Sequence, residues 1–460
     1  MRLPFLDRKQ ELDRLRRAVS AREDSLAVIY GRRRCGKSRL LLEALRGRAA
    51  AYYVGDEREG ALQRRSLATA MGRLVPGFEQ VEYPGWEALL DRFWRDAPNN
   101  AVLALDEFPY LVSASPELPS LLQKRIDAHS PQRLHVVLCG SSQRMMQGLV
   151  LDSTAPLYGR AREILKILPL PAGWIEHAFS FKDDLKLLEA YSVWGGVPRY
   201  WELANEFRDT PRAVASLVLD PLGTLHEEPD RLLLEDLWET AQAASVLSLI
   251  GEGCHKISEI AGRLAKPVTS LSRPLSRLLE LGFVEREIPF GALERDSKRS
   301  RYRIADPFLS FWFRFASPRR SLIEARQSTT LDGELRKYLP IQTGEFWERL
   351  ARSSVPLVAI GGKRWRPAAR WWGGGLDRRP VEIDIVASSE DGTAILVGEA
   401  KLRLTPRDWD REAAALLEKA RQCPAAQGLR VIPAIWCAAG GKPPAGVSAI
   451  DAGRVMAALR

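Results

Sequence analysis

Short apolar runs alternate with amphipathic segments through the first third of the chain. Four runs have the length and composition of buried strands, and a fifth candidate follows at 163–168: SLAVIY (25–30), AYYV (51–54), AVLAL (101–105), LHVVLC (134–139) and EILKIL. The segments between them have helical patterns, at about 7–23, 38–46, 60–74, 85–96 and 117–129. Strands that alternate with helices predict an α/β domain with a parallel sheet covered on both faces.

Beyond residue 170 the pattern becomes helical and then changes twice more. Residues 342–460 contain strand-like runs at 381–387, 394–400 and 431–438, and a helical pattern at 407–422. We therefore predict five parts: a nucleotide-binding core (1–170), a helical lid (171–235), a winged helix-turn-helix (236–316), a polar linker (317–341) and a second α/β domain (342–460).

The octapeptide GRRRCGKS (31–38) predicts a phosphate-binding loop. It fits G-x-x-x-x-G-K-[ST], and it lies between a predicted strand and a predicted helix, which is the context that such a loop requires. Gly31 and Gly36 let the backbone curl around phosphates, Lys37 supplies a positive charge, and the Ser38 hydroxyl reaches Mg²⁺. ATP and Mg²⁺ are therefore the expected cofactors.

The run AVLALDEF (101–108) predicts the second half of this site. Asp106 would hold Mg²⁺ through water, and Glu107 would orient the water that attacks the phosphate. At the end of a further strand, Ser141 either contacts the γ-phosphate or belongs to a serine pair that caps the next helix. Arg160 either pairs with a phosphate or is an ordinary surface arginine.

Residues 245–304 have the pattern of a winged helix-turn-helix. Apolar residues recur at helical spacing in two helices, and GFVEREIPFG…SKRSRYRIAD predicts a two-stranded wing with a basic tip. Arg273 and Arg277 of the second helix, with Lys298, Arg299 and Arg301 of the wing, are candidate contacts to DNA. Such units also serve as protein–protein modules. Pro274 departs from an ideal recognition helix and is acceptable if Ser272 is the N-cap, an arrangement that would shorten the helix.

Two strand-like runs in the last part place acidic residues close to a lysine. Glu399 and Lys401 share one face of a strand because side chains alternate, and Asp384 lies in the preceding strand. Carboxylates suit Mg²⁺, and Lys401 would assist with charge or deprotonation, so phosphodiester hydrolysis is the predicted chemistry. Glu348, in the upstream helix GEFWERLAR, offers a further carboxylate. The arrangement resembles the PD-(D/E)xK nuclease core, which can also bind nucleic acid without cleaving it.

Composition adds the cellular context. The formal net charge of +10 is consistent with a polyanionic partner such as DNA, and equally with a merely basic protein. The five cysteines are scattered singly, which argues against a zinc site or a disulfide framework. The chain shows no apolar leader and no run long enough to cross a membrane, so we expect a cytoplasmic protein.

The order of these motifs resembles the archaeal-type P-loop ATPases of the STAND/AAA-like group. The resemblance rests on FLDRKQEL, GRRRCGKS, LDEF, LCGSS with PLYGR, GGVPRYW, YRIADPF, FWFRF, GEFWERL, the pair Trp371 and Trp372, EIDIVA and GEAK. It implies ATP binding and hydrolysis with a nuclease-like C-terminal domain. This sequence departs from the usual pattern at Ala400 and Leu402, which leaves the acidic and lysine positions intact.

The resulting hypothesis is an ATP-dependent switch of class α/β. A P-loop NTPase sheet of AAA-like or STAND type is followed by the winged helix and a restriction-endonuclease-like domain, and the chain acts on DNA as an ATP-controlled nuclease. The alternatives are a STAND-type signalling or regulatory ATPase that binds without cleaving, and a chaperone-like remodelling ATPase. Assembly into a homo-oligomer is compatible with each of these functions.

Overall fold

The computed structural model describes residues 3–128, 133–237, 240–293 and 299–460. They form two compact units. One contains Phe5–Pro169 with Leu234–Leu237, and the other contains Met1–Pro4, Leu170–Leu233 and Trp238–Arg460. Among the helices described, none combines the length with the apolar character that a bilayer crossing needs.

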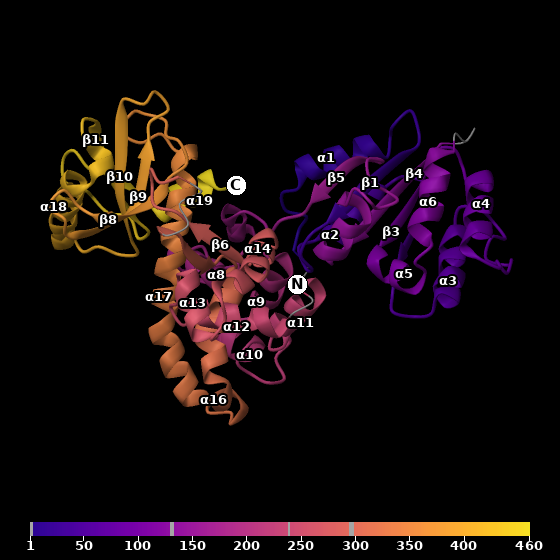
Figure 1. Ribbon diagram of the computed structural model, residues 1–460, viewed down its shortest axis with the longest axis horizontal. Helices are drawn as coiled ribbons and strands as arrows, with labels where there is room; N and C mark the ends of the chain where they lie inside the picture. The colour runs from indigo at the N-terminus through magenta and orange to yellow at the C-terminus, as the bar shows by residue number, and fades with distance from the viewer. Residues whose placement is uncertain (1–2, 129–132, 238–239, 294–298) are drawn as a thin grey trace. The chain divides into compact units, whose positions relative to one another are not determined.

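The first unit is built on a five-stranded parallel sheet with the order β2-β3-β4-β1-β5. Its strands are β1 (Ser25–Tyr30), β2 (Ala50–Val54), β3 (Ala101–Asp106), β4 (Leu134–Gly140) and β5 (Ala161–Lys166). Every residue of β1, β3 and β4 is buried, because helices cover both faces (Figure 1). The helices are α1 (Lys9–Ala18), α2 (Lys37–Leu45), α3 (Gly60–Gly72), α4 (Trp86–Asp96), α5 (Phe108–Ala114), α6 (Leu118–Asp127) and α7 (Gln143–Met146). The predicted parallel α/β core is confirmed.

The second unit begins with a helical part and a three-helix segment that carries a hairpin. The helical part contains α8 (Asp184–Trp194), α9 (Pro198–Ala204), α10 (Thr210–Leu217) and most of α11 (Glu228–Asp236). It is followed by α12 (Thr240–Gly251), α13 (Ile257–Arg263), α14 (Ser272–Glu280) and the antiparallel pair β6 (Val284–Glu287) and β7 (Arg301–Ile304). Three helices followed by a hairpin is the element order predicted for 245–304. The N-cap of α14 is Leu271 and not Ser272, and Pro274 lies in the first turn of the helix, where proline is tolerated.

The segment predicted as a polar linker is helical instead. After α15 (Pro307–Phe311) come α16 (Arg320–Glu324) and the 27-residue helix α17 (Ser328–Ser354), which runs across the predicted domain boundary. Leu331, Leu335 and Leu339 recur every four residues and are buried. The buried Gln342 side chain of α17 donates to the Ser192 carbonyl of α8 at 2.9 Å, so this helix is packed against the helical part and does not bridge as a loose connection.

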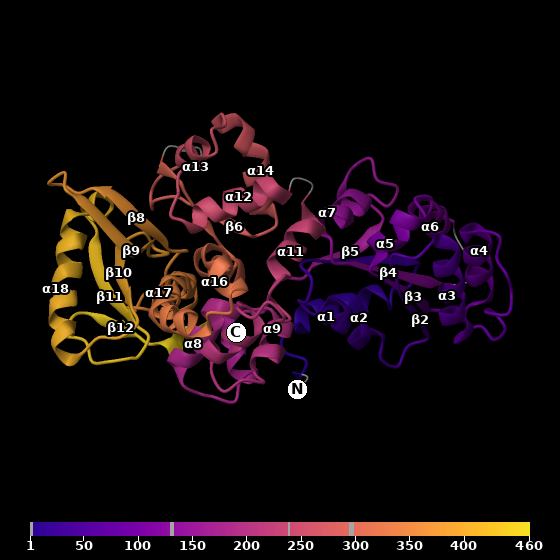
Figure 2. The same ribbon diagram turned by 90° about the horizontal axis from the view of Figure 1, so that it is seen from below.

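The C-terminal sheet is mixed and has the order β12-β11-β10-β9-β8. It contains β8 (Ala369–Gly374), β9 (Pro380–Ser388), β10 (Ala394–Lys401), β11 (Arg430–Cys437) and β12 (Ser448–Ile450), with α18 (Pro406–Gln422) and α19 (Ala452–Ala458). The pairs β8–β9 and β9–β10 are antiparallel, whereas β10–β11 and β11–β12 are parallel. Helices α17 and α18 cover opposite faces of this sheet (Figure 2). The three strands predicted from the sequence are confirmed, and β8 and β12 are additional.

Candidate functional sites

The phosphate-binding loop follows β1 at the carboxyl edge of the parallel sheet. Gly31 has φ +143°, and a Cβ there would lie 2.3 Å from the Ile167 carbonyl oxygen, so no other residue fits. Gly36 has φ +90° and is the N-cap of α2. The loop backbone is therefore shaped by its two glycines, and its last turn leads into the amino end of a helix, where anions are favoured.

The two reactive side chains of the loop differ in exposure. Lys37 is only 4% exposed, and its Nζ donates to the Arg32 carbonyl oxygen at 3.1 Å. The ammonium group is thus held inside the curve of the loop, where a phosphate group would meet it. Ser38 is exposed in the first turn of α2, which leaves its hydroxyl open to a metal or to water.

Asp106 is the last residue of β3 and is 1% exposed. Its Oδ2 accepts a hydrogen bond from the Tyr52 hydroxyl at 2.9 Å, and its Oδ1 accepts one from the Glu107 N–H at 3.0 Å. Burial, followed by the charge of Asp106, raises the pKa of Tyr52, so the phenol remains a donor. Because β3, β4 and β1 are parallel neighbours, Asp106 ends at the same edge of the sheet as the loop. Tyr52 was not recognised as part of the site from its sequence context.

Glu107 is held by Ser141, the residue that follows β4. Both oxygens of its carboxylate accept hydrogen bonds from Ser141, one from the N–H at 3.0 Å and one from the hydroxyl at 2.6 Å. Glu107 has φ +48°, an uncommon conformation for this residue type. The helix-capping role belongs to the neighbouring Ser142, whose hydroxyl accepts from the Met145 N–H at 3.3 Å. Ser142 therefore caps the helix, whereas Ser141 bonds to Glu107, and the contact of Ser141 with a γ-phosphate stays a prediction.

Two contacts at this edge come from the end of α11. Arg33 of the loop forms an ion pair with Glu235, and the Gln143 N–H donates to Asp236 at 2.8 Å. Glu235 and Asp236 belong to the short segment that clusters with the first unit. Sequence reasoning missed both of them, because more than 90 residues separate them from their partners, which are Arg33, Ser142 and Gln143.

Arg160 lies at the other end of the sheet, and the prediction that it contacts a phosphate is wrong. It directly precedes β5, whose Ala161 pairs with Leu26 near the start of β1, whereas the phosphate loop follows the end of β1. Its guanidinium forms two hydrogen bonds with Asp127, at 2.8 Å from Nε and 2.8 Å from Nη2. The surface alternative therefore holds.

The basic residues predicted to contact DNA lie in different settings. Arg273 is exposed, and Arg277 pairs with Glu280 at 2.9 Å. In the wing, the Arg299 side chain donates to the Trp372 carbonyl, and Arg301 stacks on the Trp372 ring at 4.7 Å. Lys298 lies outside the described residues. The two wing arginines that the structure describes are thus engaged by β8, in contrast to the predicted free basic tip.

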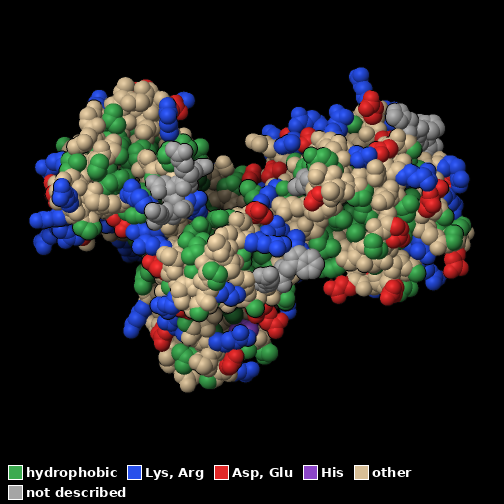
Figure 3. Space-filling model, in the orientation of Figure 1, with side chains coloured by type: hydrophobic (Ala, Val, Ile, Leu, Met, Phe, Trp, Pro, Cys, Tyr) green, Lys and Arg blue, Asp and Glu red, His purple; other side chains and the backbone are tan. Residues whose placement is uncertain are grey.

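Figure 3 shows how the charged side chains are distributed on one face of the molecule. On the face shown in Figure 3, lysine and arginine side chains are spread over both units and are interspersed with acidic ones. The formal charge of +10 therefore does not by itself mark a nucleic-acid surface.

In the C-terminal sheet, Asp384 and Glu399 are brought together by the strand register. Gly398 pairs with Ile385 in the antiparallel ladder, so the next residues along, Glu399 and Asp384, face each other across β10 and β9. Asp384 Oδ2 accepts a hydrogen bond from the Ala400 N–H at 3.1 Å. Two carboxylates thus adjoin at the end of β10, with Lys401 Nζ 3.7 Å from Glu399 Oε2.

Helix α18 adds two residues that the sequence prediction did not include. Lys419 Nζ is 2.7 Å from Glu399 Oε1, and Glu412 pairs with Lys401 at 3.3 Å. Their seven-residue spacing puts both on one face of the helix, which is the only signal that could have indicated them. Glu399 is 5% exposed, and burial followed by the charge of Asp384 raises its pKa to about 7 despite Lys419.

Glu348 stands near this pair without completing a three-carboxylate site. Burial and then the charge of Asp384 raise its pKa, which places the two groups in electrostatic contact. Yet within the described ranges no three His, Cys, Asp or Glu residues are grouped so that they could hold a metal ion. Glu348 also lies 4.0 Å from Arg352 on the same helix, and its action together with Asp384 and Glu399 in one site stays a prediction.

Comparisons with known proteins bear on two stretches of the chain. Residues 5–203 match a family described as an ATPase domain predominantly from Archaea, and residues 312–412 match archaeal and bacterial proteins of unknown function. An uncharacterized protein of Methanocaldococcus jannaschii is 29% identical over 416 residues, which cover 88% of this chain and 89% of that protein.

Similar folds occur among solved structures. The Walker-type ATPase of Pyrococcus abyssi superposes with a TM-score of 0.50 at 21% sequence identity, covering 67% of this chain and 95% of that one. The ORC2 protein of Aeropyrum pernix has a TM-score of 0.46 at 15% identity, covering 71% of this chain and 97% of that one. Because the sequence identity is only 21%, the likeness to the Pyrococcus abyssi ATPase is evidence for the fold alone.

Proposed function

We propose that this chain, which carries an archaeal-type ATPase domain followed by a segment of a family of unknown function, binds and hydrolyses ATP at the carboxyl edge of its parallel sheet. The observation that supports this most is the meeting of three motifs at that edge. The glycine-shaped loop, the buried Asp106 and the Ser141-bound Glu107 all follow strands that are parallel neighbours.

Each residue has a distinct task in this proposal. The loop amides and the ammonium of Lys37 bind the phosphates, where the charges are preorganised before ATP arrives. Ser38 and Asp106 would hold Mg²⁺, because a hydroxyl and a carboxylate are the hard oxygen donors that this ion prefers. When bound, the ion would neutralise charge on the phosphates. Glu107 orients the attacking water, and Ser141 positions the Glu107 carboxylate.

The test of hydrolysis is a single isosteric change. Glu107→Gln should lower kcat for ATP hydrolysis by roughly 100-fold or more while MgATP still binds, because general-base assistance contributes about 10²–10⁴-fold. Glu117→Gln is the control, because Glu117 is exposed at the start of α6 and has no place in the site. Full activity in Glu107→Gln would refute the role given to this residue.

For the C-terminal domain we propose metal-dependent phosphodiester hydrolysis of DNA under the control of the ATPase. Asp384 and Glu399 would hold Mg²⁺, with Lys401 beside Glu399 to balance charge at the reacting phosphate. The supporting observation is that the two carboxylates and the lysine meet at the end of one strand pair, as the nuclease core requires. Glu348 would contribute through its proximity to Asp384.

A second candidate function is DNA binding without cleavage, as part of a signalling or regulatory ATPase. One observation favours it: Glu399 is in ion-pair contact with Lys419 and Lys401, and those cations compete with a metal ion for its oxygens. The basic residue Arg273 on the exposed side of α14 is the DNA contact in either case.

Cleavage assays separate the two functions. Plasmid and linear DNA are incubated with Mg²⁺, with and without ATP, using wild type, Asp384→Asn and Lys401→Ala. The control is Asp410→Asn on α18, which is exposed. Cleavage that is lost in both site variants and kept in the control supports the nuclease. Equal background cleavage by all four proteins supports binding without hydrolysis.

A further inference from the structure

The acidic residue Glu287 of the hairpin β6–β7 lies among arginines of the hairpin, of α17 and of the C-terminal sheet. Its carboxylate contacts arginines from three different elements: Arg303 of β7 at 2.8 Å, Arg352 of α17 at 3.3 Å and Arg370 of β8 at 3.6 Å. Its side chain is 13% exposed. Burial would raise the pKa of Glu287, but the arginines outweigh burial and lower it, so the group is a carboxylate anion.

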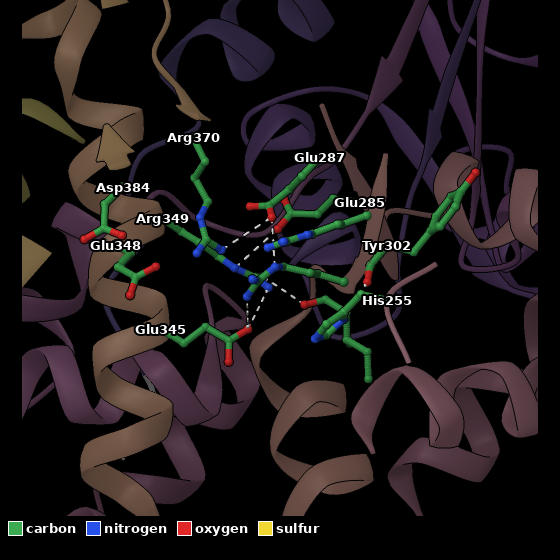
Figure 4. A network of polar contacts seen from close by, with 12 residues as sticks. His255, Glu285, Glu287, Tyr302, Glu345, Glu348, Arg349, Arg370 and Asp384 are labelled. Atoms are coloured by element: carbon green, nitrogen blue, oxygen red, sulfur yellow. Dashed lines mark hydrogen bonds and ion pairs between the residues drawn. The ribbon is translucent and has the colours of Figure 1, made fainter. Parts of the chain in front are cut away.

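These arginines stand beside the carboxylate pair of the C-terminal domain. Arg352 Nη1 donates to the Asp384 carbonyl oxygen at 3.1 Å and lies 4.0 Å from Glu348. Figure 4 shows Arg370 between Glu287 of the hairpin and the side on which Glu348 and Asp384 lie. An anion in the place of Glu287 would therefore be bound next to the strand that carries Asp384.

We propose that Glu287 occupies a phosphate-binding site made by Arg352 and Arg370, and that the DNA backbone takes its place when the hairpin is displaced. A guanidinium pairs with a carboxylate and with a phosphate through the same fork of N–H donors, so one anion can substitute for the other. The two arginines are 11% and 9% exposed while Glu287 covers them. This inference rests on the proposed action on DNA and names the residues that receive the phosphate.

The hairpin region has further attachments, of which some are exposed. Arg301 stacks on Trp372 and pairs with Glu382 at 3.3 Å, and the Phe290 N–H donates to the Arg370 carbonyl at 2.7 Å. Exposed ion pairs such as Arg301–Glu382 are weak and screened by salt, so a polyanion with several phosphates can compete with them.

Other attachments are buried and must also be released when the hairpin is displaced. Arg303 of β7 pairs with Glu345 of α17 at 3.4 Å, and Arg349 of α17 donates to the Ile304 carbonyl at 2.8 Å. In this proposal the hairpin acts as an internal cover on the phosphate-binding site.

The decisive experiment measures DNA affinity without cleavage. Binding of a fluorescein-labelled duplex to the full chain is followed by anisotropy in EDTA. Glu287→Gln keeps the shape of the residue but loses its charge, and we expect affinity to rise about tenfold, with the slope of log Kd against log salt steeper by roughly two phosphate contacts. Glu285→Gln is the matched control. It lies on the same strand but pairs with Arg349 at 3.3 Å, so affinity should stay unchanged.

A second pair of variants keeps the test valid if Glu287→Gln folds poorly. Arg301→Ala loosens the hairpin from Trp372, and it should tighten DNA binding although it removes a positive charge. Arg352→Gln combined with Glu287→Gln should abolish the gain, because it removes one of the two phosphate-binding arginines. Unchanged or weaker binding in Arg301→Ala, or in a folded Glu287→Gln, overturns the proposal and favours the wing arginine as a direct DNA contact.

The outcome is distinguishable from failure of the proposed nuclease. If Glu287→Gln binds DNA more tightly and still shows no Mg²⁺-dependent cleavage, the nuclease is refuted and the phosphate site stands. If wild type cleaves DNA and Glu287→Gln changes neither binding nor cleavage, the phosphate site is refuted and the nuclease stands.

Discussion

Replacing Lys37 by methionine tests the nucleotide site at its most sensitive point. Lys37→Met retains the length and apolar stem of a side chain that is 4% exposed, so packing changes little while the charge is lost. In the absence of nucleotide the only hydrogen bond that we find for its ammonium, among the described residues, is to the Arg32 carbonyl at 3.1 Å.

The expected loss of affinity follows from the position of the charge. A unit charge about 4 Å from another interacts by roughly 4 kcal/mol at an effective dielectric constant near 20. Part of this is offset, because the bond to Arg32 must be exchanged for the phosphate. A net loss of about 2–3 kcal/mol remains, in the upper range for a hydrogen bond to a charged group. This corresponds to a roughly 30- to 150-fold weaker affinity for MgATP.

Ligand-induced stabilisation converts this loss into a measurable quantity. At an ATP concentration of about 100 times the wild-type Kd, binding stabilises the folded ATPase unit by about 2.7 kcal/mol. A variant with 100-fold weaker affinity gains only about 0.4 kcal/mol at the same concentration. Thermal or chemical unfolding with and without MgATP measures the difference. Lys9→Met, at an exposed position of α1, is the control. A gain above about 2 kcal/mol in Lys37→Met would refute the reasoning.

Two further predictions concern the stability of the ATPase unit. Burial lowers the pKa of His135, which bonds to Ser25 at 2.9 Å, to about 4. The folded state therefore resists protonation, and stability falls as pH drops from about 6.5 towards 4, by on the order of 3 kcal/mol. Urea unfolding of wild type and His135→Gln checks this, and equal pH dependence would contradict it. Gly31→Ala should cost about 1–3 kcal/mol, because its Cβ meets the Ile167 carbonyl at 2.3 Å and φ is +143°. Gly85→Ala, where a Cβ meets open space, should be nearly neutral in the same unfolding experiment.

The sequence-based predictions that agree with the structure concern features set by residues close together in the chain. Gly31 to Lys37 are contiguous, and their conformation follows from the glycines and the flanking strand and helix. The three fully buried strands β1, β3 and β4 are recognisable because parallel strands covered on both faces need uninterrupted apolar runs. The strand β8 was missed because Ala369–Gly374 combines two tryptophans with two glycines and shows no alternation. The second half of the helix over 328–354 was predicted at 344–352, but its first half was assigned to a linker because Pro340 and a polar surface hide its buried leucine spacing.

What the tertiary structure decided is which charged groups meet. The guanidinium group of Arg160 could bind a phosphate, but the direction of β5 places it at the opposite end of the sheet from the phosphate loop. Arg301 carries the positive charge expected of a DNA contact in the wing, but it pairs with Glu382, 81 residues further along the chain. An arginine side chain pairs with whichever acidic group or carbonyl the fold places near it. The local sequence around an arginine does not show which distant segment that will be. The sequence therefore determined the phosphate loop and the strands that carry the acidic residues, and only the tertiary structure decided that Glu287 covers Arg352 and Arg370 beside Asp384.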